Sequence, residues 1–142
     1  MQLIDFNVLV YAHRGELPRH AEYRAWLENL LNGDAAFGTA TGILARFIRT
    51  VTHPRVFTPP TPIDDAIRFT EIIRKCDTCV PARPGPRHWE IFTQLCRATE
   101  ARGNIVTIAY LAALAIESGS EWITTDRDYA RFPGLRWRHP LG

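Results

Sequence analysis

Residues 122–129 of this 142-residue chain have the sequence Trp122-Ile123-Thr124-Thr125-Asp126-Arg127-Asp128-Tyr129. The stretch begins with apolar and β-branched residues and continues to two carboxylates, Asp126 and Asp128, a pattern that predicts a buried strand with acids at its carboxyl end. In an open α/β sheet, the residues that face a ligand lie at that end of the strands. The stretch therefore predicts both the type of fold and the place of its site.

The beginning of the chain repeats this pattern, because the apolar residues Leu3 and Ile4 precede Asp5. The carboxyl ends of parallel strands meet at one edge of a sheet, so we expect Asp5, Asp126 and Asp128 to lie together there. Carboxylates gathered in this way repel one another unless a cation lies between them. Oxygen ligands favour a hard divalent ion, so the predicted occupant is Mg²⁺ or Mn²⁺.

Short apolar stretches alternate with amphipathic ones along the rest of the chain. We predict further strands over residues 35–38 and 136–138, and helices over residues 19–31, 43–51, 64–76, 88–102 and 108–117, the second of them capped by Thr39 or Thr41. The proline-rich segments 58–62 and 81–86 are predicted to be loops. The alternation indicates an α/β fold with a short parallel sheet covered by helices on both faces, in a single domain over residues 1–142.

Size and composition favour one domain with a sizeable core, since 46% of the 142 residues are hydrophobic. No apolar run is long enough to cross a bilayer and the first residues do not resemble a signal peptide, so we expect a cytoplasmic protein. The cysteines Cys76, Cys79 and Cys96 are odd in number, and the C-x-x-C that two of them form has no second pair. We predict reduced thiols on helix faces rather than a zinc or redox site.

The net charge is only +2, but 16 of the 17 basic residues are arginines and Lys75 is the one lysine. A guanidinium offers a planar fork that matches phosphate oxygens, so this composition permits nucleic-acid binding. Arg14, Arg49, Arg127 and Arg131 are candidates for a groove beside the acidic edge. The alternative is that they are solvated or paired with surface acids.

The acidic residues also have simpler interpretations. Asp126 and Asp128 could cap the helix or turn that follows them. Asp5 could be the nucleophile of an aspartyl-phosphate phosphatase, but such sites favour a second acid two residues on, where this chain has Asn7. The five histidines show no spacing typical of metal ligands, so we assign them to the surface or to caps.

Four segments carry a family resemblance through their order and spacing: Ile4–His13, Phe47–Phe57, Gly103–Ala115 and Thr125–Leu135. Together they resemble the PIN-domain ribonucleases, and within them the VapC toxins of bacterial toxin–antitoxin pairs. The resemblance implies a PIN-like three-layer sandwich and a Mg²⁺-dependent, or Mn²⁺-dependent, endoribonuclease that cuts tRNA or rRNA. It also implies a VapB-like antitoxin as partner, a homodimer, and Asp5, Asp126 and Asp128 as catalytic metal ligands.

The chain departs from the family pattern at three positions. The pattern has an acid where this chain has Ile108, many members have a glutamate where it has Arg46, and a small hydroxylated residue usually stands where it has Phe6. Neither isoleucine nor arginine can bind a metal ion, so only the three aspartates transfer as ligands. An inward-facing Arg46 would either pair with Asp5 or Asp126, in competition with the cation, or bind an RNA phosphate.

Two hypotheses follow from these residues. In the first, the chain is a metal-dependent endoribonuclease with a reduced site, in which Asp5 and Asp126 bind one ion and Asp128 binds it directly or through water. In the second, it is a catalytically impaired PIN domain that binds antitoxin or RNA without cutting. The aspartates favour the first hypothesis, and the three departures favour the second.

Overall fold

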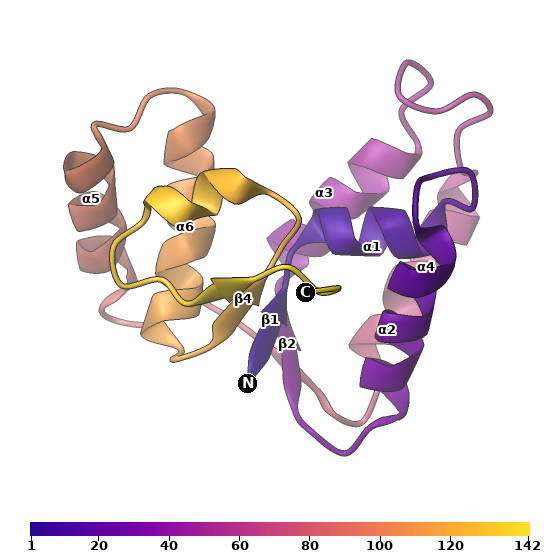
Figure 1. The fold of residues 1–142 in the computed structure, drawn as a ribbon, viewed down its shortest axis with the longest axis horizontal. Helices are drawn as coiled ribbons and strands as arrows, with labels where there is room; N and C mark the ends of the chain where they lie inside the picture. Colours follow the sequence, from indigo (N-terminus) through magenta and orange to yellow (C-terminus); the bar gives the residue numbers. More distant parts are fainter.

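The computed structural model describes all 142 residues, and five short strands form one parallel sheet at its centre (Figure 1). The strands are β1 (Gln2–Ile4), β2 (Phe37–Thr39), β3 (Cys79–Pro81), β4 (Glu121–Ile123) and β5 (Trp137–Arg138). Their order across the sheet is β3-β2-β1-β4-β5. The helices are α1 (Phe6–His13), α2 (His20–Asn32), α3 (Thr41–Val51), α4 (Ile63–Arg74), α5 (His88–Thr99), α6 (Asn104–Glu117) and the 3₁₀ helix η1 (Arg127–Arg131).

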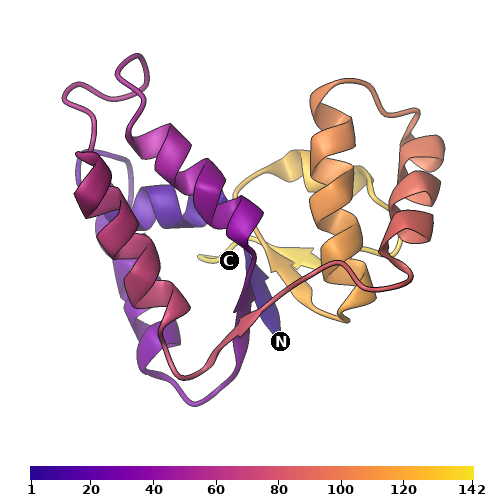
Figure 2. The ribbon, with the colours of Figure 1, turned by 180° about the vertical axis from the view of Figure 1, so that it is seen from behind.

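Helices cover the sheet from two sides, as two views of the ribbon show (Figures 1 and 2). One group contains α1 to α4 and the other contains α5, α6 and η1. Successive residues of a strand point to opposite faces, so Ile4 and Ile123 belong to the core under the first group whereas Leu3 and Trp122 belong to the core under the second. The predicted α/β fold, a parallel sheet flanked by helices, is confirmed.

The register of the central strands places two chain segments side by side at the carboxyl edge of the sheet. Strand β1 pairs with β4 so that Ile4 lies opposite Ile123. The next backbone amide, that of Asp5, donates a hydrogen bond of 2.9 Å to the carbonyl of Ile123. The residues that follow β1 and β4 are therefore neighbours, as the repeated pattern of apolar residues and acids predicts.

The sequence does not predict strand β3, because the proline-rich segment 81–86 indicates a loop. It is an edge strand that pairs with β2 alone, and it ends in Pro81, which lacks the amide that a central strand would need. Its presence also corrects the placement of the thiols. Cys79 lies in β3 and Cys76 follows the end of α4, so only Cys96 lies in a helix; all three are free.

Two helix starts also differ from the prediction. Ala40 is the N-cap residue of α3 and no side chain caps it, so neither Thr39 nor Thr41 has that role. Helix α6 begins at Asn104, four residues before the predicted start at residue 108. It does so because Gly103 adopts a φ of 53°, which is readily available to glycine, and turns the chain into the helix there. No helix is long and apolar enough to span a membrane.

Candidate active site

Asp5 lies at the carboxyl end of β1, where it is the N-cap residue of α1 and only 1% exposed. Three donors hold its carboxylate. The backbone amide of Phe6 donates to Oδ1 at 2.7 Å, and the hydroxyl of Thr124 and the side-chain amide of Asn7 donate to Oδ2 at 2.7 and 3.1 Å. These contacts fix the orientation of a buried acid at the edge of the sheet.

Asn7 and Thr124 join the two strand ends. The side-chain amide of Asn7 also donates to Thr124 Oγ1 at 3.2 Å, and its Oδ1 accepts from the backbone amide of Thr125 at 3.2 Å. Thr124 Oγ1 accepts in addition from the backbone amide of Asp126 at 3.1 Å. Thr124 was not predicted as a site residue, because a threonine after a strand carries no distinctive signal in the sequence.

Asp126 follows β4 and is the N-cap residue of η1. Its Oδ1 accepts a hydrogen bond of 2.9 Å from the backbone amide of Asp128, so the capping role considered for it is seen. The carboxylate is partly buried, and its charge contributes to raising the pKa of Asp5. The structure therefore brings Asp5 and Asp126 close enough to interact electrostatically.

Asp128 does not join this pair. Its side chain is exposed and accepts a hydrogen bond of 3.2 Å from Arg131 within η1. No group of three or more histidine, cysteine, aspartate or glutamate side chains lies close enough together to hold a metal ion. The expected meeting of three carboxylates is thus reduced to two, and a metal-binding role for Asp128 stays a prediction.

The charge of the buried Asp5 carboxylate is only partly compensated. Burial raises its pKa from 3.8 to about 6, and the charge of Asp126 adds to this rise. Hydrogen bonds from Thr124 and Phe6 and the charge of Arg46 oppose the rise without cancelling it. Asp5 takes part in no salt bridge. Such a group favours either a proton or a bound cation.

This pKa predicts that Asp5→Asn stabilises the fold at neutral pH. The folded state holds the proton more tightly than the unfolded state, so the stability that the proton contributes is complete below pH 3.8 and is lost as the pH rises through about 6. As the pH rises from 3.8 through about 6, the free energy of unfolding of the unsubstituted chain should fall by about 3 kcal/mol relative to that of Asp5→Asn. Urea unfolding in EDTA between pH 4 and 8 measures the difference. Parallel profiles would contradict it, and the exposed Asp128→Asn provides the control.

Arg46 lies on α3 and forms no salt bridge, so of the two alternatives for an inward-facing Arg46 the pairing with Asp5 or Asp126 is not seen. Its guanidinium carbon lies 4.4 Å from the centre of the Phe6 ring instead, in a cation–π contact. One guanidinium nitrogen, Nη1, is buried without a hydrogen-bond partner.

Ile108 lies on α6, is 2% exposed and belongs to the core between α6 and the sheet. Phe6 packs against this same core. Ile108 is therefore part of an apolar core and supplies no oxygen ligand, and no third carboxylate joins Asp5 and Asp126. Because Mg²⁺ keeps several waters and needs only one or two carboxylates, Asp5 and Asp126 could hold one hydrated divalent ion.

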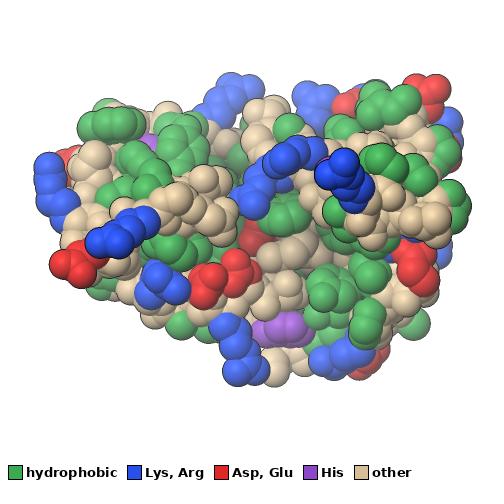
Figure 3. All heavy atoms as spheres, turned by 90° about the horizontal axis from the view of Figure 1, so that it is seen from above, with side chains coloured by type: hydrophobic (Ala, Val, Ile, Leu, Met, Phe, Trp, Pro, Cys, Tyr) green, Lys and Arg blue, Asp and Glu red, His purple; other side chains and the backbone are tan.

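A basic cleft of about 640 Å³ lies next to Asp126, because the following residue, Arg127, is part of its lining. It is lined by Arg19, Arg127, Ala130, Trp137, Arg138, His139 and Gly142, with no acidic side chain among them. Partial burial lowers the pKa of His139, and the charges of Arg19 and Arg127 lower it further. Figure 3 shows the face onto which the carboxyl ends of the strands open. Acidic side chains lie near the middle of this face, and basic side chains lie around them.

Of the four arginines proposed for a groove, only Arg127 lines this cleft. Arg14 pairs with Glu16, Arg131 pairs with Asp128, and Arg49 is exposed on α3. Arg127 forms no salt bridge, which leaves its charge free for an anion.

Comparison with known proteins places these features in context. A family model described as PIN domain matches residues 3–135. The chain is 48% identical to the VapC ribonuclease Mb2897 of Mycobacterium bovis, over 99% of this chain and 96% of that protein. It is 39% identical to ribonuclease VapC25 of Mycobacterium tuberculosis, over 99% of both chains.

Solved structures share the fold at low sequence identity. A structure of VapBC2 from Rickettsia felis, bound to a promoter DNA fragment, superimposes with a TM-score of 0.69 at 17% identity and 97% coverage of both chains. VapC20 of Mycobacterium tuberculosis, described as a toxin that cleaves the sarcin-ricin loop, gives 0.66 at 13% identity, with 96% of this chain and 99% of that chain covered. These similarities extend over the whole sheet and both groups of helices.

Proposed function

This chain belongs to the PIN-domain family, as a VapC-type member, and from that premise we propose that it is the endoribonuclease toxin of a toxin–antitoxin pair. Relatives that are 39% and 48% identical over nearly the whole chain are named ribonucleases. VapC-type PIN ribonucleases generally depend on a divalent metal ion. The observation that carries the proposal is the pair of carboxylates at the edge of the sheet, of which Asp5 is buried without a counter-ion.

We propose that Asp5 and Asp126 hold one divalent ion, with Mg²⁺ as the first choice and Mn²⁺ as the second, because their ligands are oxygen atoms. When bound, such an ion activates a water and stabilises the charge that develops on the phosphate. Asp128 remains a candidate for a ligand through water. Its carboxylate would first have to leave Arg131.

The residues around the pair prepare it for this role. Thr124, Asn7 and the amide of Phe6 hold the carboxylate of Asp5 in one orientation, which limits the reorganisation needed on binding. Near pH 6 part of the Asp5 population carries a proton, and cation binding must release it. In the basic cleft Arg127 supplies an unpaired charge for the RNA backbone, whereas Arg19 and Arg138 pair with Glu22 and Glu121.

The second candidate function is a catalytically impaired PIN domain that binds antitoxin or RNA without cutting. It is favoured by Ile108 and Arg46, which stand where the family pattern has acids, and by the absence of a third carboxylate near Asp5 and Asp126. In this case the fold and the basic cleft would be retained for binding alone.

The partners follow from the family. Structures that share the fold include VapBC complexes from Haemophilus influenzae and Salmonella typhimurium, so a VapB-like antitoxin is the partner that we assign to this chain. We propose an RNA of the tRNA or rRNA class as substrate and a homodimer as the assembly. A cytoplasmic location and a single domain over residues 1–142 complete the proposal.

The test is to incubate the purified chain with total RNA in Mg²⁺, in Mn²⁺ and in EDTA. We expect new RNA fragments in the presence of either cation and none in EDTA, because the ion is part of the proposed site. Gel electrophoresis with end labelling locates the cuts, and Asp128→Asn should still cut. RNA that is bound but left intact under all three conditions would decide for the impaired domain.

A further inference from the structure

The guanidinium of Arg46 is the most unusual charged group in the structure. It is partly buried, takes part in no salt bridge and donates no hydrogen bond, and its Nη1 is fully buried without an acceptor. Removing a charged donor from water without giving it a partner is costly. Native proteins rarely retain such a group unless it acts on something else, so its place in the fold needs an explanation.

Phe6 fixes the position of this guanidinium. Its ring centre lies 4.4 Å from the guanidinium carbon, and the ring packs against both hydrophobic cores. Because Phe6 directly follows Asp5, the residue that carries the acid is covalently joined to the residue that supports Arg46. Two of the three departures from the family pattern are therefore in direct contact.

The surroundings of Arg46 are those of the candidate active site. The charge of Arg46 lowers the pKa values of Asp5 and of the buried Tyr129. The charges of Asp5 and Asp126 raise the pKa of Tyr129. Neither carboxylate approaches within salt-bridge distance of the guanidinium. Ile108, the third departure, supplies no acid that could neutralise it either. The site thus holds a fixed positive charge beside, but not bound to, its carboxylates.

We propose that Arg46 is a positioning residue that binds a phosphate of the RNA substrate beside Asp5 and Asp126, with Phe6 as the platform that orients it. This inference rests on the proposed RNA substrate and goes beyond it by naming the group that holds the backbone. A guanidinium held against a ring keeps its plane fixed, and because Arg46 is only partly buried, its Nε and Nη2 atoms rather than the buried Nη1 can donate to an anion. Phosphate oxygens are the acceptors that this fork fits, and charge-assisted hydrogen bonds to them are the stronger kind.

An RNA backbone suits the site better than an acidic protein segment. The basic cleft that begins at Arg127 contains Trp137, so it offers a single strand both positive charge and an aromatic side chain. Arg46 and Arg127 lie on elements that both begin at the carboxyl edge of the sheet, since α3 follows β2 and η1 follows β4. A continuous polyanion such as RNA could contact both arginines. The competing ligand is an acidic segment of the antitoxin, and the test must distinguish it from RNA.

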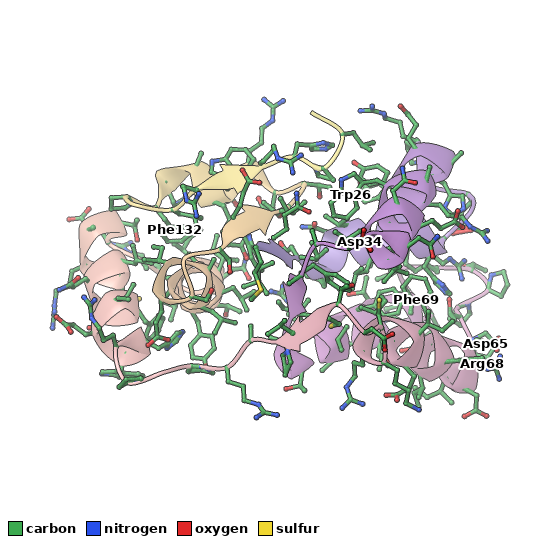
Figure 4. All side chains as sticks on the ribbon, turned by 90° about the horizontal axis from the view of Figure 1, so that it is seen from below. Trp26, Asp34, Asp65, Arg68, Phe69 and Phe132 are labelled. Carbon is green, nitrogen blue, oxygen red and sulfur yellow. The ribbon has the colours of Figure 1, made fainter.

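The experiment measures binding without cleavage. A fluorescent single-stranded RNA is titrated in EDTA with Arg46→Ser, Arg46→Lys and Phe6→Leu variants, at several salt concentrations. Arg68→Ser is the matched control, because it removes the same charge from the outer edge of α4, away from the sheet, where Arg68 pairs with Asp65 (Figure 4). Circular dichroism verifies that each variant is folded.

We expect Arg46→Ser to weaken RNA binding about 10-fold and to reduce the salt dependence by about 0.7 in log–log slope, the value for one phosphate contact on a single strand. Arg46→Lys and Phe6→Leu should show smaller losses, since the first keeps the charge and the second keeps the arginine. Arg68→Ser should bind as the unsubstituted chain does.

Two results would overturn the inference. Unchanged RNA affinity together with tighter Mn²⁺ binding in Arg46→Ser would make Arg46 a competitor of the cation. Weaker binding of the antitoxin with unchanged RNA affinity would make it part of the protein interface. Cleavage does not enter the comparison, so an unsubstituted chain that binds RNA through Arg46 but never cuts it would refute the proposed ribonuclease activity and support this inference.

Discussion

Asp5→Asn is expected to reduce cation-dependent RNA cleavage by about 100-fold or more. Loss of a residue that merely orients a metal ligand typically costs 10- to 100-fold, so removing the charge of a proposed ligand should cost at least as much. Asparagine keeps the size of the side chain and one oxygen that can accept from the backbone amide of Phe6, while its amide nitrogen replaces the oxygen that accepts from Thr124 and Asn7. The loss would therefore report the missing negative charge rather than a collapsed edge of the sheet.

The measurement is the initial rate of cleavage of a short RNA in saturating Mn²⁺. Asp126→Asn should behave like Asp5→Asn, whereas Asp128→Asn should lose less than about 10-fold, because that side chain is exposed and paired with Arg131. The higher stability expected of Asp5→Asn at neutral pH excludes unfolding as the cause. A variant that still cuts at the original rate, with the same need for a cation, would place the ion elsewhere.

The position of the acidic pair was predictable because it depends on a pattern that the sequence repeats. An apolar strand followed by an acid occurs at Asp5 and again at Asp126, and a parallel register brings such residues to one edge. The contacts that hold Asp5 were only partly predictable. A role for Asn7 in ordering the loop could be inferred, but the hydroxyl of Thr124, 119 residues away, becomes a partner only once β1 and β4 pair.

Asp128 shows why spacing alone misplaced a residue. Two acids at positions i and i+2 would share a face of an extended strand, but β4 ends at Ile123 and the chain turns into η1 at Arg127. The turn directs Asp128 to the surface and to Arg131. Strand β3 was missed for a different reason: Val80 is 40% exposed, so this edge strand lacks the buried apolar pattern that identifies a strand.

The departures from the family pattern could be found in the sequence, but their coupling could not. Charge alone suggests a carboxylate or an RNA phosphate as the partner of Arg46, whereas the structure places its guanidinium against the ring of Phe6, 40 positions away along the chain. His88 is a similar case: it is buried and hydrogen-bonded to the backbone carbonyl of Tyr110, so it is neither a surface residue nor a cap, the two roles that the sequence suggests for the histidines.

Ile108→Asp is expected to strengthen binding of Mn²⁺ and to raise the rate of RNA cleavage by about 10-fold or more. The substitution restores an acid at the position where the family pattern has one, and a third carboxylate raises both the charge and the number of oxygen ligands available to the ion. Without the cation the same change should destabilise the fold by about 3–5 kcal/mol, because Ile108 is buried and a charge there would be unpaired. Calorimetric titration with Mn²⁺ and urea unfolding in EDTA measure the two effects.

Ile108→Asn separates the charge of the new side chain from its size and polarity. It should destabilise the fold in the same direction, because it also buries a polar group in an apolar core, but it should bring little gain in cation affinity. If Ile108→Asp binds Mn²⁺ no better than Ile108→Asn, the position does not face the ion in this chain. If cleavage occurs only in Ile108→Asp, then Asp5 and Asp126 alone do not support catalysis. The unsubstituted chain is in that case the impaired PIN domain, in which Ile108 abolishes the activity and the fold is kept.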